Sequence, residues 1–299
     1  YGTDSNNSAN RTIVVMTDDA LNGDGDAGDD IFGATLPAFP DGTVVDFFIS
    51  ASDGVNTRTW PGPTDETGGQ GANALFQVEA TQVASDQGLP VYRLILSPDE
   101  KEEFEFENFD DDSDAQMNAT FISQVGDDVD VRYLAGIRRR GAGSRSRDPR
   151  TFRLSLAADR PWQDTTKMNL NAQFNYMQLF GQKLFAAARL PSAKARSIEL
   201  FLNAEDESVV TGRLLGAYVH LEPQGSDSVA RQFPDDPSGN LYSKRRPDTK
   251  LAYRDGNIDD YIDDGWDKET NNSEADWSDL DAWLAVIRDS TNPNYLADL

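Results

Sequence analysis

The feature that most constrains this chain is the uneven distribution of its charge. Its 299 residues include 52 acidic and 27 basic residues, which gives a formal net charge of -25 at pH 7. Residues 132–160 reverse this balance, with nine arginines against two aspartates. Guanidinium groups gathered in one place repel one another unless anions lie between them. The segment therefore predicts either pairing with the protein's own carboxylates or a site that binds a phosphate.

The acidic composition excludes several functional classes. A net charge this negative repels nucleic acids and anionic membranes. No segment approaches the ~20 consecutive apolar residues of a membrane-spanning helix. Cysteine is absent, which excludes disulfides and cysteine-based zinc sites. Together these features predict a secreted bacterial protein, extracellular or at the cell surface, without a membrane span.

The hydrophobic pattern divides the chain into two expected domains joined by a linker. Short β-branched and aromatic segments with turns between them, such as 11–16 and 43–51, predict a small acidic Ig-like β-sandwich in residues 1–82. Glycine and proline predict a linker at 83–90. Residues 91–299 predict an α+β domain with a mixed or antiparallel sheet. The expected fold class is therefore mainly β plus α+β.

Two helices are expected in the second domain. The first begins at Asn171, and its apolar face consists of Phe174, Met177, Leu184, Phe185 and Ala188. The second runs from about Asp276 to Arg288, and its apolar stripe consists of Trp277, Leu280, Leu284 and Ile287. The polar residues 223–272 between the two helices predict loops.

An acidic, glycine-rich segment near the N-terminus is a candidate metal site. Oxygen ligands at alternate positions suit a hard cation such as Ca²⁺. The candidate ligands are Asn22, Asp24, Asp26, Asp29 and Asp30. The segment lacks the spacing and the terminal glutamate of a helix-loop-helix calcium site, so a solvated acidic turn is the alternative. A second acidic cluster, at 110–114, predicts an exposed loop.

A glycine- and arginine-rich turn between two expected strands is the second candidate site. Glycines allow the backbone to approach a ligand closely, and arginines bind phosphates through paired hydrogen bonds. The candidate residues in the turn are Arg138, Arg140, Gly141, Gly143 and Ser144. No Gly-Lys-Ser/Thr follows, so the turn is not a Walker loop. A hairpin whose arginines pair with nearby carboxylates explains the residues equally well.

Other catalytic chemistries have little support in the sequence. His220 is the only histidine and lies in an expected buried strand. No Gly-x-Ser-x-Gly segment is present to position a serine nucleophile. No pair among the 52 carboxylates stands out as the acid and base of a glycosidase.

Eight short segments follow one another in a family-specific order from residue 91 onward. They are 92–98, 136–141 with Ser144, 151–154, 168–171, 183–185 with 190–191, 198–203, 216–222 and 239–242. This order resembles the CotH (spore-coat protein H) kinase-like family. Residues 16–32 and 47–60 resemble the small sandwich that precedes such domains in large secreted proteins of planctomycete-type bacteria.

The resemblance implies a divergent protein kinase that binds ATP with Mg²⁺ or Mn²⁺ and phosphorylates serine or threonine of a protein substrate. It implies that the turn from Arg138 to Ser144 covers the phosphates. Arg150 or Arg153 stands near the position of a lysine of the family. Lys183 lies on the helix that resembles the kinase αC. Glu222 ends the strand that leads to the hinge-like region.

Two departures from the family bear on activity. An arginine replaces the phosphate-holding lysine, and neither a His-Arg-Asp nor an Asp-Phe-Gly triplet occurs. In the family the catalytic and metal-binding aspartates lie further along, in a second lobe. We therefore expect the N-terminal part of a kinase-like domain that is inactive as this chain. The alternative is a calcium-stabilised extracellular protein that binds surface-layer or matrix components without catalysis.

Overall fold

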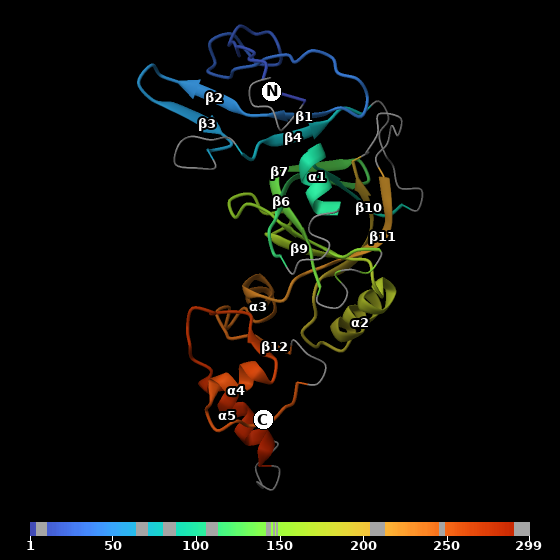
Figure 1. Cartoon of the computed structure of the whole chain (residues 1–299), viewed down its shortest axis with the longest axis vertical. Helices are drawn as coiled ribbons and strands as arrows, with labels where there is room; N and C mark the ends of the chain where they lie inside the picture. Colours follow the sequence, from blue (N-terminus) through green and yellow to red (C-terminus); the bar gives the residue numbers. More distant parts are fainter. Residues whose placement is uncertain are drawn as a thin grey trace. The chain divides into compact units, whose positions relative to one another are not determined.

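The computed structural model describes most of the chain. The described residues are 1–3, 11–63, 71–79, 88–105, 113–141, 145, 147, 149–203, 213–244 and 249–289. The chain divides into two compact units (Figure 1). The first comprises Tyr1–Ala188 and Lys194–Glu222, and the second comprises Arg189–Ala193 and Pro223–Leu299.

A closed barrel of seven strands forms the centre of the first unit (Figure 1). In barrel order the strands are β10 (Ala195–Leu202), β11 (Arg213–Leu221), β9 (Lys167–Asn171), β8 (Phe152–Ser155), β7 (Asp128–Arg139), β6 (Met117–Val125) and β5 (Val91–Ile95). Neighbouring strands are antiparallel, except that β5 and β10 run parallel and close the barrel. Closure leaves these strands without a free edge.

Alternate residues of the strands point into the barrel and form its core. Leu94, Phe121, Ile137, Leu154 and Leu200 are completely buried there. Their neighbours along each strand point outward, so the polar residues between them line the outer surface. This alternation decides which arginines of β7 and β8 face solvent.

Helix α1 (Pro98–Glu105) contributes to one end of the barrel core. Phe104 is 2% exposed, and its ring lies 5.0 Å from that of Phe152. The Phe152 ring in turn stacks on Tyr218 at 6.0 Å. Lys101 on the same helix is buried, and its Nζ donates a hydrogen bond to the carbonyl oxygen of Asn203 at 2.7 Å.

Helix α2 (Asn175–Ala187) lies against β10 and β11. The sequence predicted a helix here, but its apolar face is not buried. Phe174, Met177, Leu184 and Phe185 are between 47% and 60% exposed. Polar side chains make contacts with the barrel instead, as when Asn175 Nδ2 donates to the carbonyl oxygen of Ala217 at 3.0 Å.

The N-terminal part of the first unit contains two antiparallel strand pairs. Strand β1 (Val44–Phe47) pairs with β4 (Ala74–Gln77), and β2 (Ile49–Ser52) pairs with β3 (Thr57–Trp60). Over residues 1–3, 11–63 and 71–79 these pairs are the only sheets, so the expected Ig-like sandwich is not confirmed. The expected boundary at residue 82 and most of the linker lie outside the described residues.

This N-terminal part packs directly on the barrel. Thr120 of β6 donates its hydroxyl to the carbonyl oxygen of Leu75 at 2.6 Å. The ring of Tyr133 on β7 lies 5.8 Å from both Phe47 and Trp60, in edge-to-face arrangements. Such aromatic pairs stabilise a contact beyond the area that they bury.

The second unit has a small core of its own. Its elements are α3 (Ser226–Gln232), β12 (Tyr242–Lys244), α4 (Ile258–Asp263), β13 (Trp266–Lys268) and α5 (Ser278–Arg288). Its core consists of Tyr261, Trp266, Trp277, Leu280 and Leu284.

Two expectations for the second unit have different outcomes. The helix predicted from about Asp276 is present as α5, and its stripe residues Leu280 and Leu284 are buried. The prediction that 223–272 forms loops was wrong, because α3, β12, α4 and β13 all lie in this range. Buried Tyr261 and Trp266 explain how so polar a segment becomes ordered.

The overall class agrees with the expectation of a mainly β protein with additional helices, and the barrel sheet is mixed, with one parallel pair. Among the helices that the structure describes, none has the length and apolar character needed to cross a membrane.

Candidate functional site

Three arginines gather on the outer surface of the hairpin formed by β7 and β8. Arg138 and Arg153 are direct partners in the register of the two strands. Both point outward because their neighbours Ile137 and Leu154 point into the core. Arg140 follows β7 by one residue, and its backbone N–H donates to the carbonyl oxygen of Thr151 at 2.9 Å. The hairpin ladder therefore fixes all three positions.

Arg140 carries the clearest electrostatic signature of the cluster. Burial, followed by repulsion from Arg153 and then Arg138, lowers the pKa of its guanidinium to about 10. Its Nη1 donates a hydrogen bond to Asn171 Oδ1 at 2.9 Å. Asn171 is neutral, so this bond satisfies a donor without offsetting the positive charge. The arrangement favours a bound anion.

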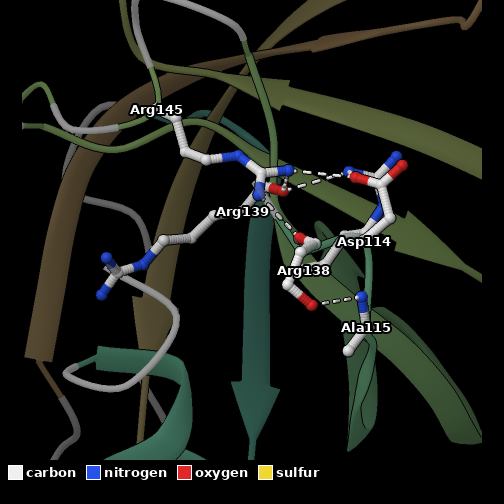
Figure 2. Close-up of polar contacts among 6 residues, drawn as sticks. Asp114, Ala115, Arg138, Arg139 and Arg145 are labelled. Carbon is white, nitrogen blue, oxygen red and sulfur yellow. Dashed lines mark hydrogen bonds and ion pairs between the residues drawn. The ribbon is translucent and has the colours of Figure 1, made fainter. Parts of the chain in front are cut away.

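Part of the arginine-rich segment pairs with the protein's own acid. Arg138 Nη1 lies 2.6 Å and Arg145 Nη2 lies 3.0 Å from Asp114 Oδ1. Figure 2 shows Arg138 and Arg145 converging on Asp114, whereas the side chain of Arg139 extends away from it. Arg145 Nη1 also donates to the carbonyl oxygen of Ser113 at 2.6 Å. Pairing with the protein's own carboxylate therefore occurs at Arg138 and Arg145.

A comparison with known families decides the family of this chain. The sequence model of the family described as CotH kinase protein matches residues 137–298. This match covers more than half of the 299 residues. The chain belongs to the CotH kinase family. A search of curated proteins finds no match.

The family match begins within β7 and includes the whole arginine cluster of this CotH chain. Gly141 has a φ of 114°, a backbone conformation that residues with a side chain rarely adopt. A glycine is therefore required where the chain leaves the strand. Gly143 and Ser144, also predicted for the site, lie outside the described residues.

The remaining residues that the resemblance assigned to the site differ in burial and in their hydrogen bonds. The backbone oxygen of Arg150 accepts a hydrogen bond from the Tyr218 hydroxyl at 2.8 Å. Lys183 is exposed on α2. Glu222 is buried, and its Oε2 accepts a hydrogen bond from the backbone N–H of Lys194 at 3.0 Å. Glu222 thus joins the chain just before β10 to the chain just after β11.

Two asparagines of β9 were missed as site residues. Asn171 accepts from Arg140 and donates through Nδ2 to Gln178 Oε1 at 2.7 Å, which links the cluster to α2. Asn169 is the strand partner of Arg153, and its Oδ1 is buried with no described residue donating to it. Both flank the inward-facing Leu170, and this alternation was the available signal.

Arg139 also differs from its neighbours. It is only 2% exposed because its position in the strand turns it toward the barrel end rather than outward. Its carbonyl oxygen accepts hydrogen bonds from Arg138 Nη1 at 3.2 Å and Arg145 Nη2 at 3.4 Å. Arg139 therefore belongs to the fold rather than to the outer cluster.

His220 is buried in a strand, as the sequence predicted, and this strand is β11 of the barrel. Its Nδ1 is 2.9 Å from the Tyr92 hydroxyl, and its ring lies 5.5 Å from that of Trp162. Burial is the main cause that lowers its pKa to about 4, with a further contribution from Arg196. The neutral imidazole is a core residue with a hydrogen-bond partner.

The lowered pKa of His220 predicts how stability depends on pH. Folded His220 stays neutral down to about pH 4, whereas in the unfolded chain it binds a proton below about pH 6.5. Stability is therefore lost as pH falls through this window, by about 2 kcal/mol between pH 7 and pH 5. Urea unfolding at both pH values should show this loss, and His220→Gln should remove it. Equal losses in both proteins would show that His220 is already charged when folded.

The predicted metal ligands lie apart from the arginine cluster in sequence, in the N-terminal part. Asp24 is buried, whereas Asn22, Asp26, Asp29 and Asp30 are exposed. Among the residues that the structure describes, no three His, Cys, Asp or Glu side chains form a group that could hold a metal ion.

Proposed function

We propose that this chain binds the phosphates of ATP on the outer surface of β7 and β8, as part of a secreted CotH-type protein kinase. One observation carries the proposal. Arg140 is crowded by Arg138 and Arg153, yet its hydrogen bond goes to the neutral amide of Asn171. A polyphosphate would supply negative charge to Arg140, because its hydrogen bond to Asn171 supplies none.

The chemistry of the cluster suits a polyphosphate. A guanidinium donates two parallel hydrogen bonds to phosphate oxygens, and Arg138 and Arg153 stand side by side across the hairpin. Arg140 extends the row toward the glycine turn. Adjacent arginines can thus contact successive phosphates, as the family's use of ATP with Mg²⁺ or Mn²⁺ requires.

The family's activity is phosphoryl transfer to a serine or threonine of a protein substrate. We expect this activity only in a polypeptide that also carries the catalytic aspartates. Transfer depends on carboxylates that hold the metal ions and position the acceptor hydroxyl. No His-Arg-Asp or Asp-Phe-Gly triplet occurs in the 299 residues. We expect these residues alone to bind ATP without transferring its phosphate.

Calorimetric titration of the chain with ATP, in the presence of Mg²⁺ or Mn²⁺, tests the proposal. We expect one binding site, with an affinity that falls as salt rises because screening weakens the attraction of exposed charges. AMP should bind more weakly because it carries a single phosphate. The absence of heat with both metals, or equal affinities for ATP and AMP, would contradict the proposal.

A further inference from the structure

An acidic loop near the N-terminus holds a carboxylate that the loop itself does not satisfy. Backbone hydrogen bonds between Thr17 and Gly33, at 2.9 and 3.0 Å, close the loop. It contains six aspartates, and no lysine or arginine occurs anywhere in residues 12–57. Arg11, the nearest base before this stretch, is bound to Asp46 through both carboxylate oxygens. The loop therefore has no basic residue of its own.

Two carboxylates of the loop stabilise its conformation by accepting hydrogen bonds from backbone N–H groups within it. Asp18 accepts hydrogen bonds from the backbone N–H groups of Gly28 at 2.6 Å and Asp30 at 2.9 Å. The carboxylate of Asp29 accepts hydrogen bonds from the backbone N–H groups of Ile31 at 2.9 Å and Asp26 at 3.1 Å. Asp29 is exposed and Asp18 is partly exposed, so backbone amides and water together can satisfy their carboxylate oxygens.

Asp24 differs from all of them. It is 1% exposed, and its Oδ2 accepts a hydrogen bond from the Asp19 backbone N–H at 2.6 Å. Its Oδ1 is also buried, and no described residue donates a hydrogen bond to it. The side chain is turned inward against Gly33, where an added Cβ would lie 2.9 Å from Asp24 Cβ and 2.8 Å from the Asn22 carbonyl oxygen. Asp24 therefore places a buried carboxylate oxygen, with no described donor, on the inner side of the acidic loop against Gly33.

A buried carboxylate oxygen without a hydrogen-bond donor is unfavourable, and a cation bound to Asp24 Oδ1 would offset this cost. We propose that the loop binds one Ca²⁺ ion through Asp24 Oδ1. Calcium accepts backbone carbonyls and waters beside a carboxylate, in flexible geometry, whereas Mg²⁺ demands a near-ideal octahedron. Because few acids converge on the site, we expect a weak site, with a dissociation constant of about 10⁻⁴–10⁻³ M, as in extracellular modules.

The inference revises the ligand set expected from the sequence and does not depend on ATP binding. Of the five residues expected, Asp24 becomes the anchoring carboxylate. The side-chain oxygen of Asn22 already accepts a hydrogen bond from the Thr35 hydroxyl at 2.6 Å, so Asn22 is removed from the ligand set. Asp26, Asp29 and Asp30 remain on the exposed surface of the loop.

Thermal unfolding of the chain with and without Ca²⁺ tests the site. After treatment with EDTA, millimolar Ca²⁺ should raise the melting temperature by several degrees, and Mg²⁺ at equal ionic strength should raise it much less. Asp24→Asn keeps the shape and an acceptor for Asp19 but removes the charge. The melting temperature of this variant should not respond to Ca²⁺. In EDTA it should equal or exceed the melting temperature of the unmodified protein.

The matched control is Asp53→Asn, in the exposed turn between β2 and β3. Asp53 also accepts backbone hydrogen bonds, from Val55 and Asn56, but it is exposed. This variant should keep the full response to Ca²⁺. Equal responses to Ca²⁺ and Mg²⁺, or a response that survives in Asp24→Asn, would show general screening of acidic charge and would overturn the site.

Hydrogen exchange locates the site in the unmodified protein, without relying on a variant that folds. Millimolar Ca²⁺ should slow amide exchange in residues 17–33 and leave the β2–β3 turn unchanged. Unchanged exchange in residues 17–33 at saturating Ca²⁺ would contradict the inference.

Discussion

Replacing Arg140 with glutamine is expected to lower the affinity for ATP by about 10- to 100-fold. A hydrogen bond from a charged donor to phosphate contributes about 1.5–3 kcal/mol, which corresponds to this range. Arg140 is central because it is partly buried and lies among the charges of Arg138 and Arg153. Calorimetry on the variant and the unmodified chain under the same salt conditions measures the change.

A second readout separates binding from a structural role. Removing the charge of Arg140 relieves its repulsion with Arg138 and Arg153, so the melting temperature without ATP should stay unchanged or rise slightly. The matched control is Arg160→Gln, at an exposed turn of the barrel, which should bind ATP normally. Unchanged affinity in Arg140→Gln, or equal losses in both variants, would refute the assignment.

Replacing Asn203 with alanine is expected to destabilise the first unit by roughly 2–5 kcal/mol. The side-chain amide of Asn203 accepts from the backbone N–H of Leu96 at 3.0 Å and donates to its carbonyl oxygen at 2.9 Å. Alanine would leave both buried groups of Leu96 without a partner at the point where β5 leaves the barrel. Urea unfolding followed by circular dichroism measures the loss.

Two further variants make the Asn203 prediction specific. Asn203→Asp keeps an acceptor for the Leu96 N–H and should lose less stability than alanine. Asp159→Ala, at an exposed turn of the same unit, should change stability by less than about 0.5 kcal/mol. A loss below 1 kcal/mol in Asn203→Ala would mean that water replaces the amide and that this end of the barrel is open.

Local patterns allowed the sheet after residue 91 to be predicted, but not its closure. The sequence predicted a mixed or antiparallel sheet there, and strands β5 to β11 form a mixed one. The barrel closes because Glu199 pairs with Val91 and Leu202 with Leu94 in parallel. Such contacts join residues more than a hundred positions apart, and no turn signal or periodicity encodes them.

The N-terminal part shows the limit of strand propensity. Residues 11–16 have the composition of a strand, but the structure gives them no strand, and Ile13 and Val15 are 89% and 78% exposed. A strand requires a partner as well as suitable residues. Residues 43–51 have such partners in β4 and β3, and they form β1 and β2.

The candidate site was predictable in type but not in detail. The sequence predicted a group of arginines that either binds a phosphate or pairs with carboxylates. The structure shows Arg138 and Arg145 paired with Asp114, and phosphate binding stays a prediction. Which arginines pair with a carboxylate depends on the alternation of side chains along the strands and on the position of Asp114, in the chain before β6. Asn171 could not be linked to Arg140 from sequence, because their contact follows from the order of β7, β8 and β9.

The most direct test of the central claim is a crystal structure of the chain with a non-hydrolysable ATP analogue and Mg²⁺. The account predicts phosphate oxygens within hydrogen-bonding distance of the guanidinium groups of Arg140 and Arg153. A nucleotide bound elsewhere on the protein would contradict it. A crystal without bound nucleotide in which both guanidinium groups form ion pairs with the protein's own carboxylates would also contradict it.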